Sequence, residues 1–166
     1  NELVDRMLTM ARNEYKYIAD CHFERGALPR VFCRAGDIGQ VVLNIVVNAA
    51  HAIDERVRDD KSGHTRGHIS VRSRLEGDSV LIEIGDDGKG IPHAVREHIF
   101  DPFFTTKAVG LGTGQGLAIA RRVVEAHRGS LTFTTELGRG TTFLIRLPIA
   151  GTATTREAEA EAMLGA

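Results

Sequence analysis

The chain has 166 residues, of which 42% are hydrophobic and 26% charged, and its formal net charge is −1. A chain of this length buries enough surface to form a core without disulfides or metals, so we expect one folded domain. The nearly neutral charge argues against nucleic acid or an anionic lipid surface as a partner. Cys21 and Cys33 form no CxxC pair and are typical of a reduced, cytoplasmic protein.

Hydropathy excludes a membrane-embedded chain. No apolar run approaches the length of a membrane span, about 18 residues, and no charged and then apolar leader opens the sequence. We therefore expect a cytoplasmic domain without direct membrane contact.

Apolar residues recur at helical spacing from Leu3 to Ala11, which predicts that residues 1–14 are the end of a preceding helix or a linker, and that the chain is a piece of a longer protein.

The first half of the chain contains several predicted elements. Residues 15–23 and 30–33 flank a glycine and a proline and predict two short strands. A long helix is predicted from Asp37, as its N-cap, to about Val57. Residues 68–75 and 79–85 alternate apolar and polar side chains on either side of a Glu-Gly-Asp turn, which predicts a β-hairpin.

The second half opens with a glycine-punctuated region, residues 85–116, in which only a short helix over residues 94–100 is expected. A helix is then predicted from Leu117 to His127, with Gly129 in the C′ position that ends it. A second hairpin is predicted around the turn ELGRG, with these side chains facing inward: Leu131, Phe133, Phe143, Ile145 and Leu147.

These elements predict an α+β fold, a two-layer sandwich in which a mixed, mostly antiparallel sheet packs on about three helices. Residues 15–149 are expected to form the folded domain. Residues 150–166 are small, polar and acidic, and we expect them to form a flexible tail.

Residues 41–53, VVLNIVVNAAHAI, are apolar enough for a core helix but contain two asparagines and a histidine. A helix advances about 100° per residue, so five polar side chains fall on one stripe about 80° wide. They are Gln40, Asn44, Asn48, His51 and Glu55. Because a buried amide without a partner costs roughly 1–3 kcal/mol, the stripe should meet a polar ligand or the backbone of a neighbouring loop.

The sequence IEIGDDGKGIP, residues 82–92, places Asp86 at a strand end, just before two glycines. An ordinary turn has this composition as well. An ionised carboxylate only accepts hydrogen bonds, so an Asp86 that faces a purine would receive the amino group of adenine and reject the oxygen of guanine. Such a mismatch is worth about tenfold to a hundredfold in affinity.

The sequence GLGTGQGLAIA, residues 110–120, has a glycine at every second position before a helix starts. Glycines let backbone N–H groups approach an anion, and a helix N-terminus adds partial positive charge, so a phosphate cradle is favoured over a merely flexible loop. The sequences GxxxxGK[ST] and GxGxxG are both absent, which excludes the P-loop and the dinucleotide fold.

Four segments in this order resemble the ATP-binding domain of bacterial sensor histidine kinases. NIVVNAAHAI, DDGKG, IFDPFFTTK and GTGQGL are similar to its N box, first glycine box, phenylalanine box and second glycine box, and GSLTFTTELGRGTTFLIRLP follows them. The resemblance covers residues 1–149. It implies a domain of the superfamily of gyrases, heat-shock chaperones and histidine kinases, with ATP and Mg²⁺ as cofactors.

The resemblance also implies roles for individual residues. Asn48 would ligate Mg²⁺, Asn44 and His51 would approach the metal's waters and the phosphates, and Asp86 would hold the adenine amino group. The residues expected to shape the base pocket are Gly88, Gly90, Ile91 and, through water, Thr141. The residues expected along the phosphates are Gly112, Thr113, Gly114, Gly116 and Leu117. A mobile lid would lie between Phe103 and Gly112, with Lys107 as the cation nearest the γ-phosphate.

The implied activity is transfer of the γ-phosphoryl group of ATP to a histidine on a separate helical dimerisation domain, for relay to a response-regulator receiver domain. The parent protein would be a homodimer. None of the seven histidines has an acid after it and a proline four residues later, so the acceptor histidine is expected outside this chain. Two alternatives remain: an ATP-hydrolysing conformational clamp of the same superfamily, and a degenerate nucleotide-binding module. Asn44 occupies the position of the clamps' water-activating glutamate, and an amide cannot accept that proton.

Overall fold

The computed structural model describes residues 1–59, 66–106 and 114–150. Its helices are α1 (Glu2–Tyr15), α2 (Ala35–Asp59), a 3-10 helix η1 (His93–His98) and α3 (Gly116–Ala126). Its strands are β1 (Ala19–Glu24), β2 (Gly67–Glu76), β3 (Ser79–Asp86), β4 (Ser130–Glu136) and β5 (Gly140–Pro148).

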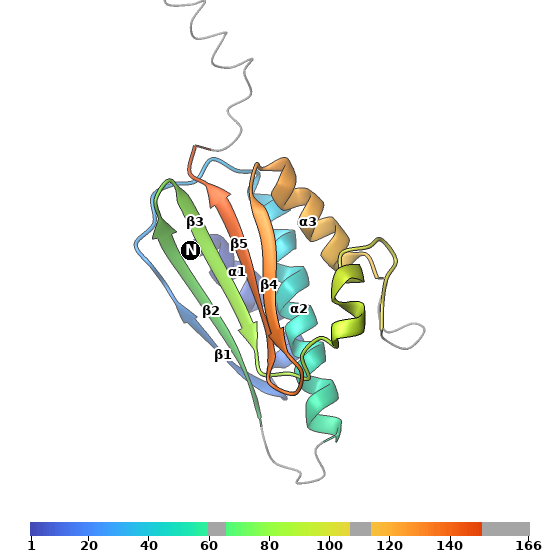
Figure 1. Cartoon of the computed structure of the whole chain (residues 1–166). Coiled ribbons are helices and arrows are strands. Elements are labelled where there is room, and N and C mark those ends of the chain that lie inside the picture. Colours follow the sequence, from blue (N-terminus) through green and yellow to red (C-terminus); the bar gives the residue numbers. More distant parts are fainter. Residues whose placement is uncertain (60–65, 107–113, 151–166) are drawn as a thin grey trace, which may run out of the picture.

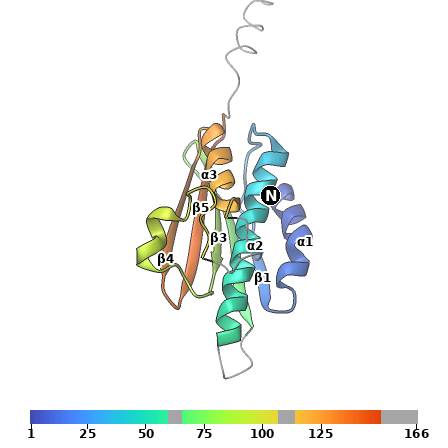
Figure 2. The ribbon, with the colours of Figure 1, turned by 90° about the vertical axis from the view of Figure 1, so that its right-hand side faces the viewer.

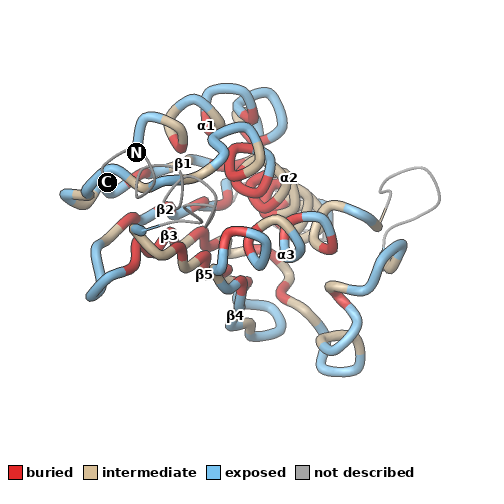
Figure 3. Tube along the Cα trace, turned by 90° about the horizontal axis from the view of Figure 1, so that it is seen from above, coloured by how far each residue is buried: buried red, intermediate tan, exposed pale blue. Residues whose placement is uncertain are grey.

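The strands form one five-stranded sheet in the order β1-β2-β3-β5-β4 (Figure 1). β1 pairs with β2 in parallel, and the other pairs are antiparallel. The three α-helices cover one face of this sheet, with α1 packed beside α2 (Figure 2). Seen from above, the buried parts of the helices face the buried parts of the strands (Figure 3). The predicted fold class, a mixed and mostly antiparallel sheet on about three helices, is confirmed.

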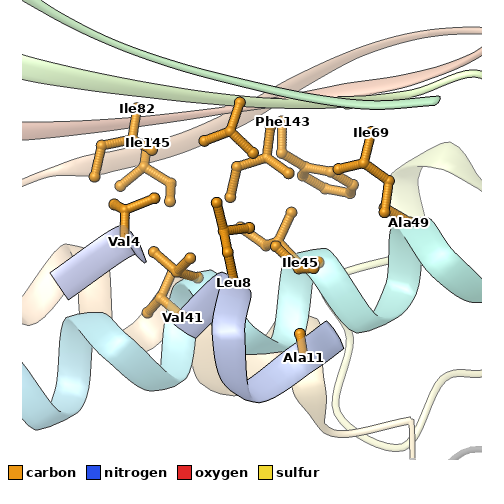
Figure 4. Packing of buried hydrophobic residues seen from close by; sticks show 14 of the residues in the cluster. Val4, Leu8, Ala11, Val41, Ile45, Ala49, Ile69, Ile82, Phe143 and Ile145 are labelled. Atoms are coloured by element: carbon orange, nitrogen blue, oxygen red, sulfur yellow. The ribbon is translucent and has the colours of Figure 1, made fainter. Parts of the chain in front are cut away.

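The core lies between the two layers. Figure 4 shows Val4 and Leu8 of α1 and Ile45 of α2 pointing toward Ile82 and Ile145 on the sheet. α2 is the most deeply buried helix, because both the sheet and the other helices pack against it. The side chains on the remaining surface of α2 are therefore held in fixed positions.

Both predicted hairpins are confirmed within a residue or two of their expected ends. In β2, buried and exposed residues alternate from Gly67 to Ser73, as the apolar and polar alternation predicts. The predicted inward residues of the second hairpin are buried, except that Phe133 is half-buried. There its ring lies against the rings of Phe100 and Phe143.

The predictions for the first 40 residues need three corrections. The strand expected over residues 15–23 begins only at Ala19, because Tyr15 still belongs to α1 and residues 16–18 form a turn. Residues 30–33 form no strand, because β1 pairs in parallel with the distant β2 rather than with the segment next to it. The chain from Gly26 instead passes the end of β2, where the Gly26 N–H donates to Ser73 Oγ over 3.0 Å. Asp37 is not the N-cap of α2; it lies in the first turn, where its charge complements the helix dipole.

The end of α3 also differs from the prediction. The C-cap is His127, so Arg128 occupies C′ with φ 56°, and Gly129 follows it. The N–H of Gly129 bonds to the carbonyl of Val124, and that of Arg128 to the carbonyl of Glu125, both over 2.9 Å, which is a Schellman motif. Gly129 is required for another reason: a Cβ there would lie 2.2 Å from the Arg146 oxygen of β5.

Candidate functional site

A cavity of about 390 Å³ lies between α2, the end of β3, the segment around η1 and the start of α3. Its polar lining comes from α2, from the ends of β3 and β5, and from the loop residues Lys89, Thr105 and Thr106. Its apolar lining includes Ile91, Val95, Ile99, Phe104, Leu117 and Phe143. A hollow with an apolar wall and a few convergent polar groups suits a planar heterocycle that carries polar substituents.

The polar stripe of α2 faces this cavity. Asn44, Asn48, His51 and Glu55 line it. Gln40 is not among the lining residues, and its Nε2 donates to Asn44 Oδ1 over 2.8 Å. Asn44 Nδ2 in turn donates to the Gly116 carbonyl over 3.1 Å. The second alternative for the stripe is therefore met by Asn44, which satisfies the backbone of a neighbouring segment, and the cavity leaves room for a polar ligand beside the stripe.

Asp86 ends β3 at the opposite wall of the cavity. Its Oδ1 accepts a hydrogen bond from the Gly88 N–H over 2.8 Å. Burial raises the pKa of Asp86 to about 6, and the nearby Asp87 adds to the increase, whereas backbone hydrogen bonds from Gly88 and Thr141 and the charge of Arg56 oppose it. The carboxylate is therefore held in a poorly solvated place where a ligand's donor would stabilise it.

Thr141 stands next to Asp86, because the two residues are partners in the β3–β5 ladder. Thr141 is 5% exposed and lines the cavity. The close approach of the two strands depends on Gly140, which has φ 115° and whose Cβ would lie 1.9 Å from the Asp86 carbonyl oxygen. Asp86 and Thr141 are thus fixed side by side by the sheet.

The glycines after Asp86 fit the chain between α2 and the β4–β5 turn. A Cβ on Gly88 would lie 2.6 Å from Ala52 C, and one on Gly90, which has φ 72°, would lie 2.2 Å from Glu136 O. Gly90 and Ile91 line the cavity, whereas Gly88 packs behind its wall. Lys89 lines the cavity too and forms an ion pair with Glu55, which ties this loop to α2.

The second group of glycines reaches the cavity at the start of α3. Gly114, Gly116 and Leu117 line it. Gly114 has φ 65°, and a Cβ there would lie 2.5 Å from Phe103 C. Gln115 is the N-cap of α3 and makes no side-chain hydrogen bond that caps the helix. The partial positive charge of a helix N-terminus favours an anion at this end of the cavity. Gly112, Thr113 and Lys107 lie outside the described residues.

Some lining residues were missed by the sequence analysis. Lys89 lies between two glycines that were predicted to be in the site, and its position in the motif could have indicated it. Val95 and Ile99 lie four residues apart in the short helix expected over residues 94–100, a spacing that places them on one face. Phe104 belongs to a segment without regular periodicity, so no local pattern shows that its side chain turns inward. Phe143 was predicted only as a core residue, although it also lines the cavity.

Comparison with known families decides what this arrangement belongs to. The family model described as "Histidine kinase-, DNA gyrase B-, and HSP90-like ATPase" matches residues 34–151. The chain belongs to this family. The match includes α2, both groups of glycines and the β4–β5 hairpin. Membership of this ATPase family supports ATP as the substrate of the domain. Many of the residues that the resemblance assigns to ATP line the cavity described above, although Gly88 does not.

Individual members of the ATPase family are similar over most of the chain. Sensor histidine kinase ZraS of Escherichia coli is 38% identical over 122 residues, which are 74% of this chain and 24% of ZraS. Sensor kinase CckA of Brucella abortus is 40% identical over 119 residues, which are 68% of this chain and 12% of CckA. The chain thus spans a quarter or less of these relatives.

Solved structures give the same result. The catalytic domain of histidine kinase ThkA superposes with a TM-score of 0.72 and 28% identity, covering 90% of this chain and 92% of that one. The mycobacterial sensor histidine kinase MprB superposes with a TM-score of 0.69 and 29% identity, covering 91% of this chain and 95% of that one. Within the described part of this ATPase domain, no helix has both the length and the apolar character to cross a bilayer.

Proposed function

We propose that this chain is the catalytic domain of a sensor histidine kinase, which transfers the γ-phosphoryl group of ATP to a histidine on a separate helical dimerisation domain. The phosphoryl group then passes to the receiver domain of a response regulator, and the parent protein acts as a homodimer. The names of ZraS, CckA and ThkA, all sensor or histidine kinases, support this proposal.

One observation supports it most strongly: the polar stripe of α2, Asp86 and the start of α3 line a single cavity. Asp86 and Thr141 would hold the adenine edge, with Gly90 and Ile91 along the base and Gly88 behind them. The phosphates would extend toward Gly114, Gly116 and Leu117, and toward Gly112 and Thr113. Lys107 would supply a cation to the γ-phosphate. We assign this nucleotide-binding unit to residues 15–149.

Mg²⁺ fits the donors of this cavity. Asn48 offers an amide oxygen, which is the kind of ligand that Mg²⁺ prefers. In the described parts of the chain, no cluster of three or more His, Cys, Asp and Glu side chains could hold a metal by itself. We therefore propose that Asn48 and the phosphates hold Mg²⁺ together, as is usual for this ion, and that the ion neutralises phosphate charge.

The chemistry of Asn44 favours transfer over hydrolysis. Its side chain is an amide with the NH₂ group directed at Gly116 and the oxygen directed at Gln40, so it offers no base to a water molecule. Asn44 and His51 would instead position phosphates and bound water. Phosphoryl transfer mainly requires positioning and charge neutralisation, provided that an acceptor histidine arrives in line.

The test is to incubate the domain with ATP labelled at the γ-phosphate and with the separately produced helical domain of its parent protein. Label on a histidine of the helical domain is expected, and release of free phosphate instead would indicate a hydrolysing clamp. Asn48→Asp serves as the matched variant, because it changes one atom of the amide and should disturb Mg-ATP binding. An affinity identical to that of the unmodified domain would remove Asn48 from the site.

A further inference from the structure

Three polar residues form a row across the sheet at the edge of the cavity. Thr135 on β4 pairs with Thr141 on β5, and Thr141 pairs with Asp86 on β3. Thr141 and Asp86 line the cavity, and Thr135 stands one strand farther out. On the same face of the sheet, the next row contains Phe133, Phe143 and Ile84 in the same order, so the polar row marks the boundary of the apolar sheet face.

The Thr135 hydroxyl is the centre of a small hydrogen-bond network. Its Oγ1 accepts from the Ile91 N–H over 2.9 Å and donates to the Gly140 carbonyl over 3.0 Å. It also lies 3.0 Å from the Thr141 Oγ1, a contact in which either oxygen could supply the hydrogen. A hydroxyl has one hydrogen and two lone pairs. With its hydrogen on Gly140, Thr135 can only accept from Thr141.

We infer that Thr135 is a specificity-determining positioning residue, which fixes the hydroxyl hydrogen of Thr141 and leaves only lone pairs of Thr141 facing the cavity. This inference rests on the proposed function, because it concerns how the same cavity selects its base. Asp86, when ionised, likewise only accepts. The end of the cavity therefore accepts hydrogen bonds at two adjacent positions, directly or through water.

Such a surface favours a purine with an amino group at this edge over one with an oxygen there. Without the Thr135 hydroxyl, the Thr141 hydrogen could turn toward the cavity and donate to that oxygen. Discrimination between the two bases would then fall. Thr135 also helps to hold the Ile91 main chain, whose carbonyl accepts from Arg96 Nε over 3.1 Å. Loss of that structural role alone would weaken the binding of both kinds of nucleotide equally.

The experiment compares the binding of ATP and inosine triphosphate, which has an oxygen in place of the adenine amino group. The measured quantity is the dissociation constant of inosine triphosphate divided by that of ATP. It is determined for the unmodified domain, Thr135→Val and Thr135→Ser, and thermal unfolding checks that each one is folded. We expect the unmodified domain to prefer ATP about tenfold to a hundredfold. Thr135→Val should lower that ratio about threefold to tenfold, and Thr135→Ser, which keeps the hydroxyl, should preserve it.

A double-variant cycle separates this role from packing. In a Thr141→Val background, adding Thr135→Val should leave the ratio unchanged, because there is no longer a hydroxyl to orient. If Thr135→Val weakened the binding of both nucleotides equally and left the ratio unchanged, the inference alone would be overturned. An unmodified domain that binds neither nucleotide would instead overturn the proposed function, and the inference with it.

Discussion

The side-chain amide of Asn44 donates a hydrogen bond to the main-chain oxygen of Gly116 over 3.1 Å, which joins the middle of α2 to the first residue of α3. The amide has a fixed orientation, because Gln40 Nε2 donates to its oxygen over 2.8 Å. The two helices that border the cavity are thus connected at the point where the phosphates of a nucleotide are proposed to lie.

Asn44→Asp tests this connection. The substitution replaces a donor with an acceptor opposite the Gly116 carbonyl, so two acceptors face each other. We expect the free energy of unfolding to fall by about 1–3 kcal/mol, as measured by denaturant titration. Arg122→Ala, at an exposed position of α3, is the control and should cost less than about 0.5 kcal/mol. Equal stability of the Asn44→Asp and unmodified domains would show that the hydrogen bond does not join the helices in solution.

The sequence predicted elements well where the pattern is local. The alternation in residues 68–75 specifies which face of β2 is buried, and that face is the same whichever strand lies next to it. The partner of β1 could not be predicted in this way. Its neighbour β2 is more than 40 residues away, and a parallel pair has no turn that would indicate it. This is why residues 30–33 were wrongly expected to be a strand.

The candidate site was predictable to the extent that each motif has its own local chemistry. The stripe from Gln40 to Glu55 follows from helical periodicity, and the structure places four of its five side chains on the cavity. The role inferred for Thr135 depends on the register of the β4–β5 hairpin, which sets Thr135 opposite Thr141. The raised pKa of Asp86 depends on burial by segments distant in sequence, which no motif reports.

Asp86 should make adenine binding depend on pH. Its pKa is about 6 in the folded protein, and only the ionised form is acceptor-only toward the amino group. We expect the affinity for adenosine, which has no phosphate to titrate, to be about tenfold lower at pH 5 than at pH 8. A fluorescence or calorimetric titration across this range measures the effect. Asp86→Asn should bind weakly and equally at both pH values, and an Asp86→Asn variant with the same pH dependence would assign the titration to another group.

The same carboxylate should lower the stability of the fold at neutral pH. The folded state binds the Asp86 proton more tightly than the unfolded chain does, because the pKa rises from 3.8 to about 6. Its ionisation therefore costs no stability below about pH 4, a growing amount up to pH 6 and a constant amount above. Asp86→Asn should raise the free energy of unfolding at pH 8 by about 1–3 kcal/mol, with the gain absent at pH 4. Glu97→Gln, at an exposed position, is the control. A gain in the free energy of unfolding for Asp86→Asn that is the same at both pH values would show that it does not come from ionisation of the carboxylate.

The end of α3 gives two substitutions with opposite expected effects. Arg128 has φ 56°, which costs a residue with a Cβ about 1 kcal/mol, so Arg128→Gly should stabilise the domain by about 0.5–1 kcal/mol. Gly129→Ala should destabilise it by about 1–3 kcal/mol, because the new Cβ would meet the Arg146 oxygen at 2.2 Å. Gly36→Ala, with nothing within 4 Å of the added Cβ, is the matched control and should be neutral or slightly stabilising. Denaturant midpoints measure all three, and a loss of stability for Arg128→Gly as well as for Gly129→Ala would mean that Gly129, not Arg128, adopts the left-handed conformation that ends the helix.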